Sequence, residues 1–101
     1  MTTSPLTYPA KACLTEFLQI DGLLPNNSKT INYNTDSTKK ILGVGGNLTN
    51  MNTNEFFFMD NVTVSITYTL TGTANNTNNW LITIKNLTNN SYNIKLIVFV
   101  G

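Results

Sequence analysis

The chain has 101 residues, which is enough for one domain with one core and an arm at most. Charged residues make up only 11% of it, against about 25% in typical soluble domains, and the net charge is +1. There is no Arg, and the six Lys are scattered apart from the pair at 39–40. The chain therefore lacks the clustered positive charge of proteins that bind nucleic acid or anionic membranes.

Polarity comes instead from 17 Asn and 17 Thr, while the β-branched and aromatic content argues against disorder. We expect a folded domain with an uncharged polar surface. Cys13 is the only cysteine, so no internal disulfide forms. Because the chain has no His to activate the thiol, we expect Cys13 to be buried and to pack like a small apolar side chain. No signal peptide and no transmembrane segment are expected, which predicts synthesis in a host cytoplasm.

Residues 1–9, "MTTSPLTYP", predict an extended N-terminal arm, because each of the two prolines also pushes its predecessor into extended geometry. Residues 10–101 are then a single β domain. The stretch at 10–22 is ambiguous: Leu14, Phe17 and Leu18 fit a helical stripe, whereas alternation of apolar residues also fits a strand. The strand is favoured because everything downstream has β character.

Residues 23–30 predict a turn through "PNNS". Residues 29–34 and 38–46 predict a hairpin connected by "TDS", and residues 46–54 a polar loop. Strict alternation at 62–70 predicts a strand with one buried face, formed by Val62, Val64, Ile66, Tyr68 and Leu70.

Residues 71–79 predict a long turn, and residues 80–86 a strand in which Trp80 is a core anchor. The last strand, residues 92–101, has an inner face that consists of Tyr92, Ile94, Leu96, Val98 and Val100. Short strands separated by turns indicate an all-β fold, an antiparallel β-sandwich or small barrel of Ig-like or jelly-roll-like type.

No catalytic, cofactor-binding or metal site is predicted. The absence of His removes the commonest general base and transition-metal ligand, and the five acidic residues lie on separate segments. The "GVGG" at 43–46 lacks the Lys-Ser/Thr of a phosphate-binding loop, so a strand end or bulge is the better interpretation. The sequence favours a protein that is not an enzyme and needs no cofactor.

Two runs present apolar groups to both faces of a strand. They supply the candidate interface residues, which are Phe56, Phe57, Phe58, Met59, Ile97 and Phe99. Leaving one such Phe in water forfeits about 1.5–3 kcal/mol of burial and invites aggregation. Either the N-terminal arm or a neighbouring subunit is expected to cover the second face.

The compact β character is carried mainly by "VTVSITYTLTGT", "WLITIKNLTNNS" and "IKLIVFVG". With the arm and the uncharged surface, it resembles small β-rich virion structural proteins, namely phage capsid decoration (cement) proteins and tail or fibre accessory subunits. The resemblance implies a virion component that associates with itself, often as a trimer, and docks on a major capsid or tail protein. It implies no nucleic acid and no membrane as partner.

Two other classes stay open. A carbohydrate-binding β-sandwich module would stack sugar on Trp80, Tyr33 or Tyr68 and bind its hydroxyls with Asn side chains. A surface-fibre subunit would assemble by adding a strand to the next subunit, which requires an open sheet edge.

Overall fold

The computed structural model describes residues 14–60 and 62–101. The predicted arm (residues 1–9), the start of the predicted domain and Cys13 lie outside the described residues. Most of the described residues belong to seven strands, which are, in chain order, β1 (Leu14–Leu23), β2 (Ser28–Asp36), β3 (Ile41–Asn50), β4 (Phe56–Phe58), β5 (Val64–Ala74), β6 (Thr77–Asn86) and β7 (Tyr92–Val100). The described residues contain no helix, so the all-β prediction is confirmed and the ambiguous N-terminal stretch is a strand from residue 14 onward.

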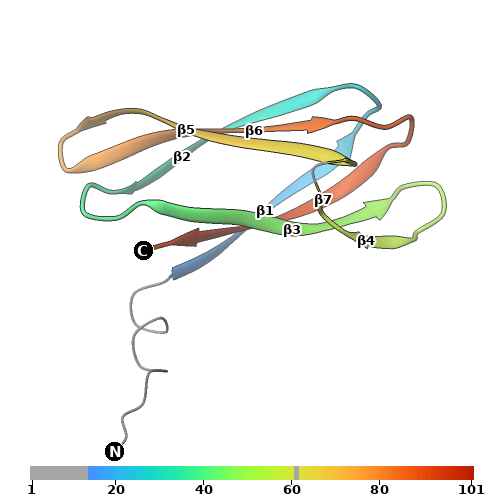
Figure 1. The fold of residues 1–101 in the computed structure, drawn as a ribbon, viewed down its shortest axis with the longest axis horizontal. Helices are drawn as coiled ribbons and strands as arrows, with labels where there is room; N and C mark the ends of the chain where they lie inside the picture. The colour runs from blue at the N-terminus through green and yellow to red at the C-terminus, as the bar shows by residue number, and fades with distance from the viewer. Residues whose placement is uncertain (1–13, 61) are drawn as a thin grey trace, which may run out of the picture.

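The strands form two antiparallel sheets packed as a sandwich (Figure 1). Sheet A has the strand order β1-β7-β3-β4, and sheet B has the order β2-β6-β5. Every pairing is antiparallel. Because β7 and β6 are the strands with neighbours on both sides along their whole length, their inward side chains form the middle of the core.

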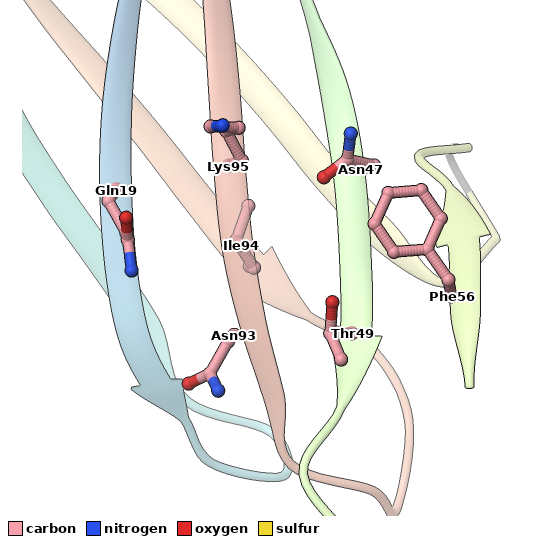
Figure 2. A pocket seen from close by; sticks show the side chains of 7 residues that line it. All are labelled: Gln19, Asn47, Thr49, Phe56, Asn93, Ile94 and Lys95. Atoms are coloured by element: carbon pink, nitrogen blue, oxygen red, sulfur yellow. The ribbon is translucent and has the colours of Figure 1, made fainter. Parts of the chain in front are cut away.

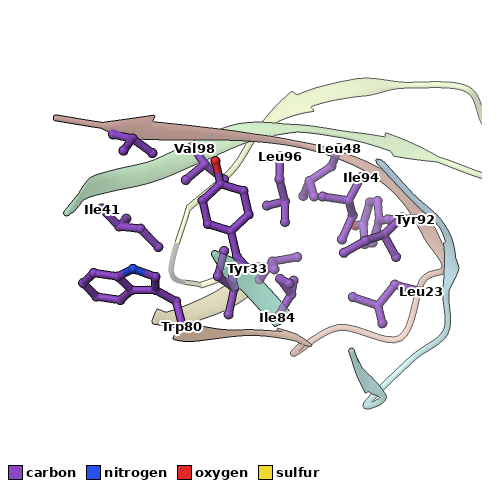
Figure 3. Close-up of a cluster of buried hydrophobic side chains, with 14 residues drawn as sticks. Leu23, Tyr33, Ile41, Leu48, Trp80, Ile84, Tyr92, Ile94, Leu96 and Val98 are labelled. Atoms are coloured by element: carbon purple, nitrogen blue, oxygen red, sulfur yellow. The ribbon is translucent and has the colours of Figure 1, made fainter. Parts of the chain in front are cut away.

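The core lies where the inward faces of β7 and β6 meet (Figure 3). All five predicted inward residues of the last strand are buried, as are Ile82 and Ile84 opposite them. Trp80 is also buried and donates its Nε1–H to Thr35 Oγ1 at 2.9 Å, which satisfies the one polar atom of the indole. The prediction of Trp80 as a core anchor is therefore confirmed.

Three local predictions are wrong. Residues 29–34 and 38–46 do not form a hairpin, because β2 pairs with β6 in sheet B while β3 pairs with β7 in sheet A. The expected polar loop at 46–54 is largely strand, since β3 runs to Asn50. The expected long turn at 71–79 is a two-residue turn, and its central residues Asn75 and Asn76 have φ angles of 53° and 61°.

The two-residue turn has a clear physical reason. A hairpin of this length takes a turn that needs positive φ at both central residues, and Asn tolerates that region better than most side chains. The flanking Thr and Gly residues, which look like turn residues in the sequence, are therefore free to continue the ladder between β5 and β6.

The buried face predicted for residues 62–70 is only half correct. Val64 is buried and Ile66 is half-buried, but Val62 precedes the strand and is exposed. Tyr68 and Leu70 remain 40% and 47% exposed, although the alternation of β5 places them on the inward face. The inward face of β5 is therefore uncovered over its second half.

Two buried asparagines hold the loops at opposite ends of β6. Asn86 donates through Nδ2 to the carbonyl oxygens of Leu23, Leu24 and Asn90, and its Oδ1 accepts hydrogen bonds from Thr88. At the other end, Asn78 donates to three carbonyl oxygens of the β2–β3 connection and accepts from Thr73. Each amide replaces water for backbone groups that would otherwise be buried without a partner.

Asn86→Ala is expected to lower the free energy of unfolding by at least about 3 kcal/mol, because several backbone carbonyls lose their donor at once. Denaturant unfolding monitored by Trp80 fluorescence measures the change. Asn89→Ala, at an exposed position of the same β6–β7 connection, is the control and is expected to change stability by less than about 0.5 kcal/mol. Equal effects in the two variants would contradict the role given to Asn86.

Gly46 is a second strict requirement of the fold. Its φ is +140°, and a Cβ there would overlap the backbone carbonyl of Lys95 and crowd Met59 Sδ. Its carbonyl oxygen accepts the N–H of Met59 at 3.1 Å, at the point where the chain leaves sheet A for sheet B. A Cβ at Gly45, one residue earlier, would meet open space.

Gly46→Ala is therefore expected to destabilise the protein by at least about 2 kcal/mol, since it combines backbone strain with a clash. Gly45→Ala is expected to be neutral within about 0.5 kcal/mol in the same unfolding experiment. A stable Gly46→Ala variant would show that β3 does not approach β7 as described.

Candidate interaction surface

The outer face of sheet B is polar and almost uncharged. Register and alternation place on it residues that include Ser28, Thr30, Asn32, Asn34, Asp36, Ser65, Thr67, Thr69, Thr77, Asn79, Leu81, Thr83 and Lys85, of which Asp36 and Lys85 are charged. Thr30, Thr83 and Thr67 form one row across the three strands, with Oγ1 atoms of the first two 3.4 Å apart. This face is what the abundance of Thr and Asn predicted, a surface suited to water.

The outer face of sheet A is different, because one half of it is apolar. Phe17 of β1, Ile97 of β7 and Gly45 of β3 lie in one row, and Phe99 lies next to Gly43 in the adjacent row. We call these five residues the apolar patch. Phe17 is 62% exposed, Phe99 is 39% exposed and Ile97 is half-buried. A Cβ at either glycine would meet open space, so the patch is recessed over β3.

The other half of this face is a shallow depression of about 210 Å³ with hydrogen-bonding walls (Figure 2). It is lined by Gln19, Asn47, Thr49, Phe56, Asn93, Ile94 and Lys95. The Asn93 side chain is held in place, since its Oδ1 accepts the N–H of Gly22 at 2.9 Å. The ammonium of Lys95 lies 5.6 Å from the centre of the Phe17 ring, which joins the depression to the apolar patch.

Four of the six predicted interface residues lie on this outer face. Phe56 pairs with Thr49 and Phe58 pairs with Asn47, so both rings stand beside the depression, 63% and 84% exposed. Ile97 and Phe99 belong to the apolar patch. Segments that are far apart in the sequence thus place their outward apolar side chains on a single surface.

The other two predicted residues, Phe57 and Met59, turn inward. Phe57 pairs with the fully buried Leu48, and its ring packs edge-on against Tyr92 with centroids 6.5 Å apart and planes at 86°. Met59 is half-buried against the core. The run at 56–59 therefore alternates in direction like an ordinary strand, with Phe56 and Phe58 turned outward, although Phe57 itself stays 41% exposed.

Sequence reasoning missed Phe17 and the role of the glycines. Phe17 was counted toward a helical stripe, but on a strand it stands on the face opposite Leu18 and Ile20. The glycines at 43 and 45 carry a usable signal, because alternate Gly in a strand leaves one face without side chains. Only the register shows that this bare face lies beside Ile97 and Phe99.

Two of the three aromatic residues proposed for sugar binding are not on the surface. Tyr33 and Trp80 are both buried, whereas Tyr68 is 40% exposed and lies beside Trp80 with ring centroids 6.5 Å apart. Stacking on a sugar ring needs an accessible aromatic face, which Tyr33 and Trp80 lack. These two residues therefore do not form the predicted platform.

Two of the five acidic residues, Asp36 and Asp60, serve local turns. Asp36 accepts hydrogen bonds from the N–H and hydroxyl of Thr38, and Asp60 accepts from the N–H groups of Thr63 and Val62. These hydrogen bonds hold the pKa of each carboxyl below its ordinary value. In the described part of the chain, no three His, Cys, Asp or Glu residues are grouped so as to hold a metal ion. Over the same residues, no helix is long and apolar enough to cross a membrane.

The side of the sandwich between β1 and β2 is closed by a tyrosine. Burial raises the pKa of Tyr33 to about 12, and the hydrogen bond and negative charge of Glu16 act in the same direction. Glu16 belongs to β1, opposite the buried Val98, so the contact ties the edge strand of sheet A to sheet B.

Comparisons with known proteins give no family for this chain: no protein-family model matches it, and neither a curated protein nor a solved structure matches it significantly. The surface must therefore be interpreted from its own chemistry.

Tyr33 is expected to ionise near pH 12, well above the ordinary value of 10.0. Because the folded state keeps a proton that the unfolded chain releases, stability is full below pH 10 and falls as the pH rises toward 12, by about 2–3 kcal/mol in total. Ultraviolet titration of the tyrosinates and unfolding at several alkaline pH values measure both effects. Tyr33→Phe is expected to remove the high transition, and Glu16→Gln to lower it without abolishing it. A Tyr33 that ionises near pH 10 would contradict the contact.

Proposed function

We propose that this protein is a non-enzymatic assembly subunit that associates with itself through the outer face of sheet A. The observation that carries the proposal is the contrast between the two outer faces. The outer face of sheet B consists mainly of Thr, Ser and Asn. The outer face of sheet A exposes four phenylalanines beside the bare backbone of Gly43 and Gly45, and they are Phe17, Phe56, Phe58 and Phe99. A monomer in water gains nothing from such a face, and exposed apolar patches mark interaction sites.

The chemistry of the face suits a protein partner. Interfaces combine aromatic anchors at the centre with hydrogen-bonding groups around them. The apolar patch supplies the anchors, and the depression beside it supplies the amides of Gln19, Asn47 and Asn93. Lys95 is the only charged residue lining that depression, so little charge has to lose its water on contact.

The wider role that we propose is a virion component, a capsid decoration protein or a tail accessory subunit, docked on a major capsid or tail protein. Low charge density limits repulsion between subunits packed side by side on a lattice. Hydrogen bonds and bridging water on Thr and Asn surfaces depend little on salt. The outer face of sheet B is then the face turned to solvent.

Size-exclusion chromatography with light scattering tests self-association. The wild type is expected to exceed the monomer mass of 11.2 kDa and to dissociate on dilution. The double variant Phe17→Thr/Phe99→Thr is expected to weaken association by about tenfold or more for each ring removed, since burying one Phe contributes about 1.5–3 kcal/mol.

The matched control is Val62→Thr, which replaces an apolar side chain that is 83% exposed but lies off this face. It is expected to leave the mass unchanged. A wild type that stays monomeric at every concentration would contradict the proposed self-association. Mass spectrometry of purified virions tests the wider role separately, and absence of the chain from them would remove the virion proposal alone.

A further inference from the structure

The fourth strand position of sheet A is only partly filled. β4 pairs with residues 47–49 of β3 and leaves the first half of β3 without this neighbour (Figure 1). Over residues 41–45, β3 has β7 on one side and, among the described residues, no strand on the other. Gly46 accepts the N–H of Met59 on that open side. Because backbone groups of a strand alternate in direction, the N–H and C=O of Val44 point to the same side.

Within residues 14–60 and 62–101, no inward side chain covers this place either. Opposite the open edge, Tyr68 and Leu70 of β5 face inward yet stay about half exposed. A cleft of about 130 Å³ lies between the two strands, and its lining consists of Val44, Gly45, Met59, Asp60, Val64, Ile66 and Tyr68. We call the open edge of β3 and this cleft together the strand slot.

The strand slot also lacks the devices that protect a sheet edge. The edge strands on the opposite side of the sandwich carry charges, Glu16 and Asp21 on β1 and Lys29 and Asp36 on β2. Neither β3 nor β5, the strands that flank the slot, contains a single charged residue or proline. Natural proteins guard exposed edges with such residues, so an unguarded edge beside an uncovered apolar face indicates a place that is paired.

We infer that the strand slot accepts a β-strand from a neighbouring copy of this chain, formed by residues 5–10 of its N-terminal segment. The added strand bonds to the backbone of β3 and lays apolar side chains over Tyr68 and Leu70. This is β-strand addition, in which main-chain hydrogen bonds give affinity and alternate side chains give specificity.

The sequence "PLTYPA" at 5–10 fits an edge strand of this kind. In an extended segment, the apolar residues Leu6, Tyr8 and Ala10 would alternate with Pro5, Thr7 and Pro9. Both prolines would therefore have their backbone nitrogens on the same side of the strand. Proline is tolerated on an edge strand where its missing N–H would face solvent. Placed that way, the apolar residues direct their N–H groups to β3 and their side chains to one face. The prolines then prevent a further strand from adding outside.

Reach favours a neighbour over the chain's own segment. Leu14, Val100 and Ile41 lie in one row, and the slot is one strand beyond β3. It is therefore three strand spacings from β1, about 14 Å. The four residue-to-residue steps from Ala10 to Leu14 span at most about 14 Å when the chain is fully extended, which leaves no length for the bends that the chain would need at both ends. A segment from an adjacent subunit has no such limit.

The inference rests on self-association as the function but uses a different surface from the apolar patch. Each chain carries one donor segment and one slot, so subunits connect head to tail. Such contacts close into a ring or a reciprocal dimer, or else continue as a filament.

A complementation experiment in the full-length chain tests the inference. Leu6→Asp/Tyr8→Asp spoils the donor and keeps the slot, whereas Leu70→Asp spoils the slot and keeps the donor. All variants are made in the Phe17→Thr/Phe99→Thr background, so that the apolar patch does not contribute, and this background is expected to stay above the monomer mass through the slot alone. Each variant alone is then expected to run at the monomer mass, and an equimolar mixture of the two is expected to form a one-to-one dimer. Thr7→Asp, which places the same charge on the solvent-facing side of the added strand, is the control and is expected to keep the mass of the background.

Val44→Pro provides an independent slot variant, because it removes the N–H that faces the slot, a change that an unpaired edge tolerates. In the same background it is expected to fold, as judged by circular dichroism, and to run as a monomer. Mixed with Leu70→Asp, which also has an intact donor and a spoiled slot, it is expected to give no dimer. If both slot variants kept the mass of the background, the slot would be overturned, and the weaker association of the background relative to the wild type would leave the proposed function standing. A mixture of donor and slot variants that stays monomeric would also overturn it.

Discussion

The inward row of β6 sets the dimensions of the sandwich. Asn78 and Asn86 stand at its two ends, with Trp80, Ile82 and Ile84 between them. Each amide satisfies backbone carbonyls of loops that join the two sheets, and a buried amide without partners is costly. The loops therefore cannot slide along the sheets, and a slip of one residue would turn every inward side chain of the strand to water.

With the core fixed in this way, the outward residues of the two central strands are free to differ. β6 turns Thr83 and Lys85 outward, whereas β7 turns Ile97 and Phe99 outward at comparable positions in its own sheet. Backbone geometry imposes neither choice, since both strands are central and antiparallel. The apolar residues on β7 are not required by the backbone, and we attribute them to the contact proposed for the outer face of sheet A.

The strands and the inner core of the second half could be predicted from sequence, because period-two alternation reports directly which face of β7 is inward. What the pattern could not report is what covers that face: Tyr68 and Leu70 alternate as faithfully as Val64 yet are exposed. Pairing was also beyond it, since the Asp36–Thr38 turn looks like a hairpin turn whether its strands pair or cross between sheets. The predicted interface residues could be recognised in the sequence only as continuous apolar runs. The register is what shows that Phe57 turns inward while Phe56 and Phe58 turn outward.

The glycine-rich start of β3 borders both candidate contact regions, which explains a motif that carries no chemistry. Gly43 and Gly45 leave the outer face of the strand bare beside Ile97, so that another surface can approach the backbone closely. Gly46 allows β3 to lie against Lys95 while the chain crosses to sheet B at Met59, and this crossing ends the slot. Val44, between Gly43 and Gly45, is the residue of β3 whose side chain lines the cleft. A strand built only to close a core would carry β-branched residues at these positions, because glycine weakens a strand. The weakness is tolerable if β3 gains its missing neighbours on assembly.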